Sequence, residues 1–274
     1  MVINSIKFGS NNMVYFPLLN FNSSFRPSTS IYNFSPNNYQ SSRKISRHLY
    51  LHYSDGSAWH SHFIKTLLPG CSLTITPDSF DFDIFCLHGT YLALYSSPIS
   101  DFNKFLPEPV NHISDTLPAW RASVSISHRS GAFTSYQGEI YPFPSKATLL
   151  SFNYFTQPPS TLNYLLFMSL ESDPSIRSAE LGFYRPKDSS SPFYSCQIFT
   201  NTINSIKLPD LFNSDDLICV KSDDCSGIPL FLSFCPSSSS LSLEHTHPPA
   251  SLAIHGNRFV AQKLLKEAWF NFLN

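Results

Sequence analysis

Proline is so frequent in this chain that few long helices can form. It occupies 21 of the 274 positions, and a proline inside a helix removes a hydrogen bond and clashes with the preceding turn. Between the prolines and the turns rich in serine and aspartate lie many short apolar or alternating runs, which are typical of strands. The sequence therefore predicts a mainly β fold, either an antiparallel sandwich or a distorted barrel.

Residues 121–129 give the clearest strand signal, because apolar and polar side chains alternate along them. One face carries Ala122, Val124, Ile126 and His128. The other face carries Arg121, Ser123, Ser125, Ser127 and Arg129. Gly131 ends the run, and we expect residues 133–140 to be its hairpin partner.

The C-terminal residues 257–273 depart from this β pattern and predict an amphipathic helix. Asn257 is a good N-cap residue. The apolar residues are spaced for one helical face, namely Val260, Leu264, Leu265, Ala268, Trp269 and Phe272. We expect an irregular N-terminal arm or short strands over residues 1–46, and one β-rich domain over 47–274 that ends in this helix.

Charged residues make up only 14% of the chain, its net charge is −1, and serine takes their place at 46 positions. A near-neutral surface gives no reason to expect nucleic acid as a partner. No apolar run reaches the length of a membrane span. We expect a cytoplasmic protein. The alternative is an organellar one, since the first 54 residues are basic and contain no acidic residue.

Six cysteines are present, enough for three disulfides, but no C-x-x-C pair occurs. Without a convincing secretory signal, an even number of cysteines is weak evidence for disulfides. We interpret them mainly as buried free thiols, which pack as small apolar residues.

Two His-x-His pairs are the strongest sign of a site. In a strand, residues two apart point to the same face, so each pair can offer two imidazoles to one metal ion. If the strands converge, a divalent metal such as Zn or Fe is the expected cofactor, and its predicted ligands are His60, His62, His245 and His247. His255 is a further candidate. The alternative is that these are unrelated polar loop residues.

Large polar side chains concentrate on the predicted hairpin around residues 121–139. His128 and Glu139 are candidates for a general base and acid, and Arg121 and Arg129 for holding a carboxylate or phosphate. The predicted substrate contacts are Trp59, Trp120, Tyr136 and Gln137. The alternative is ordinary cross-strand pairing, with Arg129 and Glu139 as a surface ion pair.

These residues lead to a hypothesis of an enzyme that acts on a small molecule or a carbohydrate, with a histidine-rich and metal-dependent polar site. The first alternative is a β domain that binds a glycan or a protein without catalysis, its aromatic residues stacking on the ligand. The second is a structural or accessory protein whose Trp269 helix docks on a partner. No sequence motif is specific enough to decide between them.

Overall fold

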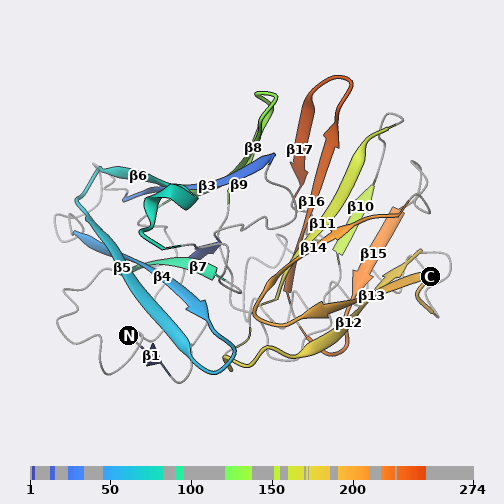
Figure 1. Ribbon diagram of the computed structural model, residues 1–274, viewed down its shortest axis with the longest axis horizontal. Helices are drawn as coiled ribbons and strands as arrows, with labels where there is room; N and C mark the ends of the chain where they lie inside the picture. The colour runs from blue at the N-terminus through green and yellow to red at the C-terminus, as the bar shows by residue number, and fades with distance from the viewer. Residues whose placement is uncertain are drawn as a thin grey trace, which may run out of the picture. The chain divides into compact units, whose positions relative to one another are not determined.

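The structure is a computed structural model, and it describes residues 2–3, 13–15, 24–33, 46–82, 90–95, 121–137, 151–154, 160–169, 171, 173–185, 191–209, 217–225 and 227–244. In this part of the chain the fold is mainly β, as predicted, and the sheets are antiparallel (Figure 1). None of the described sheets closes into a barrel. The predicted helix over 257–273 lies outside the described residues.

The described strands form four sheets. Sheet A has the order β1 (Val2–Ile3), β5 (Trp59–Leu67), β4 (Arg47–Ser54), β7 (Thr90–Tyr95) and β2 (Met13–Tyr15). Sheet B has the order β6 (Ser72–Ile75), β3 (Phe25–Tyr32), β8 (Arg121–His128) and β9 (Phe133–Gln137). A short 3-10 helix, Pro77–Ser79, follows β6.

The other two sheets are built from the later strands. Sheet C has the order β10 (Ser151–Tyr154), β15 (Leu217–Lys221), β12 (Ser178–Tyr184) and β13 (Tyr194–Phe199). Sheet D has the order β14 (Ile203–Lys207), β11 (Leu162–Ser169), β16 (Gly227–Cys235) and β17 (Ser240–Glu244). Within the described residues, no helix combines the length and the apolar character needed to cross a bilayer.

The chain contacts divide into two compact units. The first comprises Met1–Pro142, Ser172–Ile176 and Asn201–Ile203, and the second comprises Phe143–Glu171, Arg177–Thr200 and Asn204–Asn274. Sheets A and B therefore belong to the first unit, and sheet C and nearly all of sheet D belong to the second. The predicted division into residues 1–46 and 47–274 stays a prediction.

Two prolines lie inside strands that have neighbours on both sides. Pro27 on β3 pairs with Ile126 of β8, but the ladder with β6 begins only at Thr29. Pro229 on β16 pairs with Phe167 of β11, and β17 pairs only from Phe231 onward. Among the described residues, each proline thus lies where its strand has a partner on one side only, which is where a missing N–H does no harm.

The core of the second unit is shared by sheets C and D. Its fully buried members include Phe167 of β11, Leu181 and Phe183 of β12, and Val220 of β15. Phe231 of β16 joins them with 1% of its surface exposed. Burial of one large apolar side chain stabilises a fold by about 1.5–3 kcal/mol, so this cluster holds the two sheets together.

Asn204 connects β13 to β14 in the same unit. Its Oδ1 accepts a hydrogen bond from the Phe199 amide at 2.8 Å, and its Nδ2 donates to the Phe199 carbonyl at 2.9 Å. Nδ2 also lies 3.2 Å from the Phe167 carbonyl of β11. One side-chain amide therefore replaces a backbone partner for Phe199 where the chain turns from one sheet to the other.

Replacing Asn204 with Ala should lower the free energy of unfolding by about 2 kcal/mol, because three backbone groups lose their partner. Urea unfolding followed by circular dichroism measures this change. The control is Gln197→Ala, which removes an exposed amide with one hydrogen bond to Ser178 and should cost less than about 0.5 kcal/mol. Equal effects of the two substitutions would contradict the connecting role of Asn204.

Candidate functional site

The outer face of sheet B carries hydroxyl groups on all four of its strands. Residues paired across an antiparallel ladder point to the same face, so the strand register defines which side chains share it. They are Ser72 and Thr74 of β6, Ser28 and Ser30 of β3, Ser123, Ser125 and Ser127 of β8, and Ser135 of β9. We call this set the hydroxyl face.

The hydroxyl groups fall into rows that run across the strands. One row is Thr74, Ser30 and Ser123, and the next is Ser28, Ser125 and Ser135. The Oγ atoms of Ser30 and Thr74 lie 2.9 Å apart, which places both side chains on this face. Neighbouring strands are about 4.8 Å apart, so the hydroxyl groups repeat at close and regular intervals.

Two aromatic rings stand at opposite ends of the hydroxyl face. Tyr32 pairs with Arg121 at one end of the β3–β8 ladder, and its surface is 37% exposed. Phe133 pairs with Ser127 at the other end and is 62% exposed. Exposed rings of this size are unusual, because a large aromatic side chain gains much from burial.

The hydroxyl face carries little charge. Among its described side chains, the one charged group is Arg26 of β3, which forms an exposed ion pair with Asp78 of the 3-10 helix. An exposed pair of this kind contributes about 0–1 kcal/mol to stability. It neutralises this end of the face, while at the other end the backbone pairing places Arg121 opposite Tyr32.

Several hydroxyl groups of this face are available to a ligand. The side chains of Ser28, Ser123 and Ser135 make no hydrogen bond to any other described group. Each hydroxyl can donate one hydrogen bond and accept two. The face thus offers both donors and acceptors in a repeated arrangement.

The histidine and tyrosine of the predicted polar cleft lie on the other face of sheet B. Tyr136 pairs with Val124, and burial of its hydroxyl raises the Tyr136 pKa. The His128 ring packs on Phe25 at 4.9 Å between centroids. The hairpin itself is confirmed, since β8 pairs with β9 around Gly131, whose φ of +91° suits glycine.

Turn contacts already occupy one nitrogen of His128. The Ser130 amide donates to Nδ1 at 3.2 Å, and the Ser130 hydroxyl lies 2.9 Å from the same atom. Nδ1 is therefore an acceptor, and a proton there would break the bond from the Ser130 amide. Burial, and then the positive charge of Arg129, lower the pKa of His128.

The remaining residues of the predicted cleft are only partly described. Arg129 is exposed in the turn, where its amide bonds the Ser24 carbonyl at 2.9 Å. Arg121 and Gln137 are placed by backbone pairing alone, opposite Tyr32 and Ser123. Trp120 and Glu139 lie outside the described residues. The roles predicted for these side chains stay predictions.

His60 lies beside the turn between β4 and β5. Its Nε2 atom donates a hydrogen bond to Asp55 Oδ2 at 2.6 Å, and its ring stacks on Tyr53 at 5.1 Å. The bond from His60, and then the amides of Ser57 and Ala58, hold the pKa of Asp55 below its ordinary value. Because the ionised carboxylate can only accept, Nδ1 of the neutral His60 ring is an acceptor.

His62 points to the same face of sheet A as His60, as its spacing predicts. It pairs with Leu51 and contacts the rings of Phe80 and Phe82, the latter at 5.3 Å. Within the described residues, no group of three or more histidine, cysteine, aspartate or glutamate side chains is placed to hold a metal ion. His245, His247 and His255 lie outside those residues, so the convergence of the two pairs stays a prediction.

Trp59 and His52 lie on the opposite face of sheet A. Trp59 is the largest fully buried side chain, so it packs in the core, away from any ligand in solution. His52 is also fully buried, and burial lowers its pKa to about 3, opposed by a hydrogen bond to the His60 backbone. His52 is therefore neutral at physiological pH.

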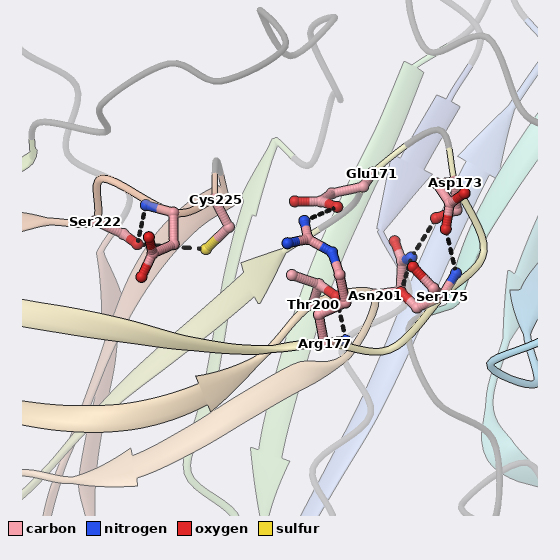
Figure 2. A network of polar contacts seen from close by, with 9 residues as sticks. Glu171, Asp173, Ser175, Arg177, Thr200, Asn201, Ser222 and Cys225 are labelled. Carbon is pink, nitrogen blue, oxygen red and sulfur yellow. Dashed lines mark hydrogen bonds and ion pairs between the residues drawn. The ribbon is translucent and has the colours of Figure 1, made fainter.

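Figure 2 shows the polar contacts around two turns, and Asn201 organises those within the first unit. Its Nδ2 donates to the carbonyls of Asp173 at 2.6 Å and Ser175 at 3.0 Å. Its φ is +53°, a left-handed conformation that asparagine tolerates better than most residues. Asn201 thus links its own turn to the backbone of the segment that contains Asp173 and Ser175.

The other contacts in Figure 2 lie within the second unit. Arg177 donates to Glu171 at 2.5 Å, and its amide bonds the Thr200 hydroxyl at 2.8 Å. The Cys225 thiol bonds the Ser222 hydroxyl, and burial raises the Cys225 pKa. These groups bond to one another, which is typical of a structural network rather than a ligand site.

Four cysteine side chains are described, and all four are free thiols. Cys225 and Cys235 are buried, Cys196 is half-buried and Cys71 is exposed. The interpretation as buried free thiols therefore holds for two of them. Comparison of the chain with protein-family models, curated protein sequences and solved structures returned no match.

The buried His52 should make the protein less stable in acid. The unfolded chain takes up a proton at His52 below about pH 6.5, whereas the folded protein takes it up only near pH 3. Stability should therefore fall as the pH drops through this window, by about 2 kcal/mol between pH 7 and pH 5. Urea unfolding at the two pH values measures the loss.

The variant His52→Leu should show a loss smaller by about this amount, because it has no imidazole to protonate. His62→Leu is the matched control on the neighbouring strand. It removes a half-exposed histidine and should retain the pH dependence of the unmodified protein. A His52→Leu variant with the full loss would show that His52 is not its source.

Proposed function

We propose that this protein binds carbohydrate without catalysis, and that the hydroxyl face of sheet B is its ligand surface. The observation that supports this proposal is the set of hydroxyl rows on four strands. Tyr32 and Phe133 are exposed at opposite ends of this face. Sugars present hydroxyl groups for hydrogen bonding and C–H surfaces for stacking. The face offers the complement of both, since serine donates and accepts and aromatic rings supply apolar contact area.

The weak charge of the face favours this ligand class over others. Phosphate or nucleic acid requires a cluster of basic side chains, and Arg26 is already paired with Asp78. A peptide that adds as a strand pairs with a sheet edge, which in sheet B is β6 or β9, whereas the hydroxyl rows lie across the face of the fully paired strands β3 and β8. Neutral glycans need neither feature.

Replacing the exposed ring of Phe133 should weaken glycan binding about tenfold, since the loss of one aromatic ring that contacts the ligand costs more than about 1 kcal/mol of binding free energy. Pull-down with cellulose, chitin and starch granules, followed by titration with soluble fragments, measures this. The variant is Phe133→Thr, because threonine keeps a high strand propensity.

Phe199→Thr is the matched control, since Phe199 is 47% exposed and lies on β13 of sheet C. It should bind like the unmodified protein. The proposal fails if none of the polysaccharides is retained, or if both variants lose binding equally.

A second proposal is an enzyme that acts on a small molecule or a carbohydrate at His60. It is favoured by the Asp55–His60 hydrogen bond, which fixes the ring and leaves Nδ1 to accept a proton. Metal ligation by His60, His62, His245 and His247 belongs to this proposal. The described residues do not make a metal site by themselves.

If His60 is a general base, the protein should hydrolyse members of a panel of chromogenic glycosides and esters. His60→Asn should then abolish turnover, and Asp55→Asn should reduce it. His48→Asn is the control, as this histidine bonds Thr66 further along the same two strands. Elemental analysis of the purified protein, with and without added Zn, tests the metal. Full turnover in His60→Asn would end the proposal.

A further inference from the structure

We infer that the ligand of the hydroxyl face is an extended, uncharged polysaccharide chain that spans the face from Tyr32 to Phe133, an inference that rests on the proposed function. The alternative within the same class is a single terminal sugar held at one ring. The register of sheet B distinguishes the two, because it fixes how far apart the rings stand.

The two rings are separated by most of the length of β8. Tyr32 pairs with Arg121, and Phe133 pairs with Ser127, which is six residues further along the strand. At a rise of about 3.3 Å per residue, the ring positions lie about 20 Å apart along the strand. They also lie on the two strands that flank β8. One sugar cannot contact both rings, whereas a chain of several units can.

The space between the rings is lined by the hydroxyl rows. A chain that runs from Tyr32 to Phe133 crosses the row of Thr74, Ser30 and Ser123, and then Ser28 and Ser135, which flank the buried Ser125. Each sugar unit repeats the same hydroxyl pattern along the chain. A repeated ligand therefore matches a repeated surface, and each additional unit adds contacts until the second ring is reached.

The charge on this path argues for an uncharged chain. A polyanion gains affinity from basic side chains, and the described basic group on the face, Arg26, is neutralised by Asp78. A polycation would require carboxylates, and Asp78 is occupied by the same pair. Among the described side chains of this path, hydroxyl groups and aromatic rings are the contacts that remain.

The test is a titration of the full chain with neutral oligosaccharides of increasing length. The probes are the β-1,4-linked glucose and N-acetylglucosamine series from dimers to hexamers, with polygalacturonate as the charged counterpart. Affinity should rise at least tenfold from dimer to hexamer in the series that binds. Polygalacturonate should bind at least tenfold more weakly than the corresponding polymer.

Tyr32→Thr and Phe133→Thr should each lower hexamer affinity about tenfold, and the double variant should lose the dependence on length. Phe199→Thr should leave every affinity unchanged. Glycan binding that is independent of length, or that needs only one ring, would overturn this inference and leave the proposed function standing. Tighter binding of polygalacturonate would overturn the uncharged ligand. If no glycan binds, this inference and the proposed glycan-binding function both fail.

Discussion

The pairing of β3 with β8 is the constraint on which the candidate site depends. Eight consecutive residues of each strand are in register, from Phe25 opposite His128 to Tyr32 opposite Arg121. Because side chains alternate between faces, a slip of one residue would exchange the buried and the exposed sets. Burial of Ile31, Val124 and Ile126 on the inner face therefore fixes which hydroxyl groups meet on the outer face. The hydroxyl face is a consequence of core packing.

The first unit also shows how the fold accommodates titratable groups. His52 is fully buried and stays neutral, whereas His60, one residue from the position paired with His52, donates to an ionised carboxylate. The two rings lie on opposite faces of sheet A. His52 shares its face with Trp59, where both side chains are fully buried, whereas His60 lies beside the Asp55 turn. Burial penalises the charged form of one imidazole, and a hydrogen bond orients the other.

The sequence was sufficient to predict the β class and the hairpin of β8 and β9, because residues 121–129 alternate cleanly and Gly131 marks the turn. It also placed the serines of β8 on one face. The same alternation occurs in residues 25–32, where Phe25, Pro27, Thr29 and Ile31 are buried, yet the prediction for residues 1–46 was only an irregular arm or short strands. A proline is allowed there because β6 covers only part of β3. How much of β3 is covered depends on its pairing with the distant strand β6, and a local sequence pattern carries no information about that pairing.

The predicted candidate site was divided by the structure for a related reason. His128 and Tyr136 share the inner face of sheet B, where the turn engages His128 and the Tyr136 hydroxyl is buried, whereas Arg129 is exposed in the turn. The sequence prediction rested on the large polar side chains of the hairpin, whereas the hydroxyl face consists of small serine and threonine side chains. Serine is the commonest polar residue of the chain, and its role emerges only when four strands are aligned.

Charge and hydroxyl groups have separate roles in this fold. Aspartate side chains act at turns, where Asp55 accepts the amides of Ser57 and Ala58, and Asp173 accepts that of Ser175. A carboxylate compensates unpaired amides there at little cost, since it remains in contact with water. Serine and threonine occupy the outer face of sheet B, where a row of like charges would repel across the strands. Low overall charge thus fits the proposal that a sheet surface, rather than a charged cleft, binds the ligand.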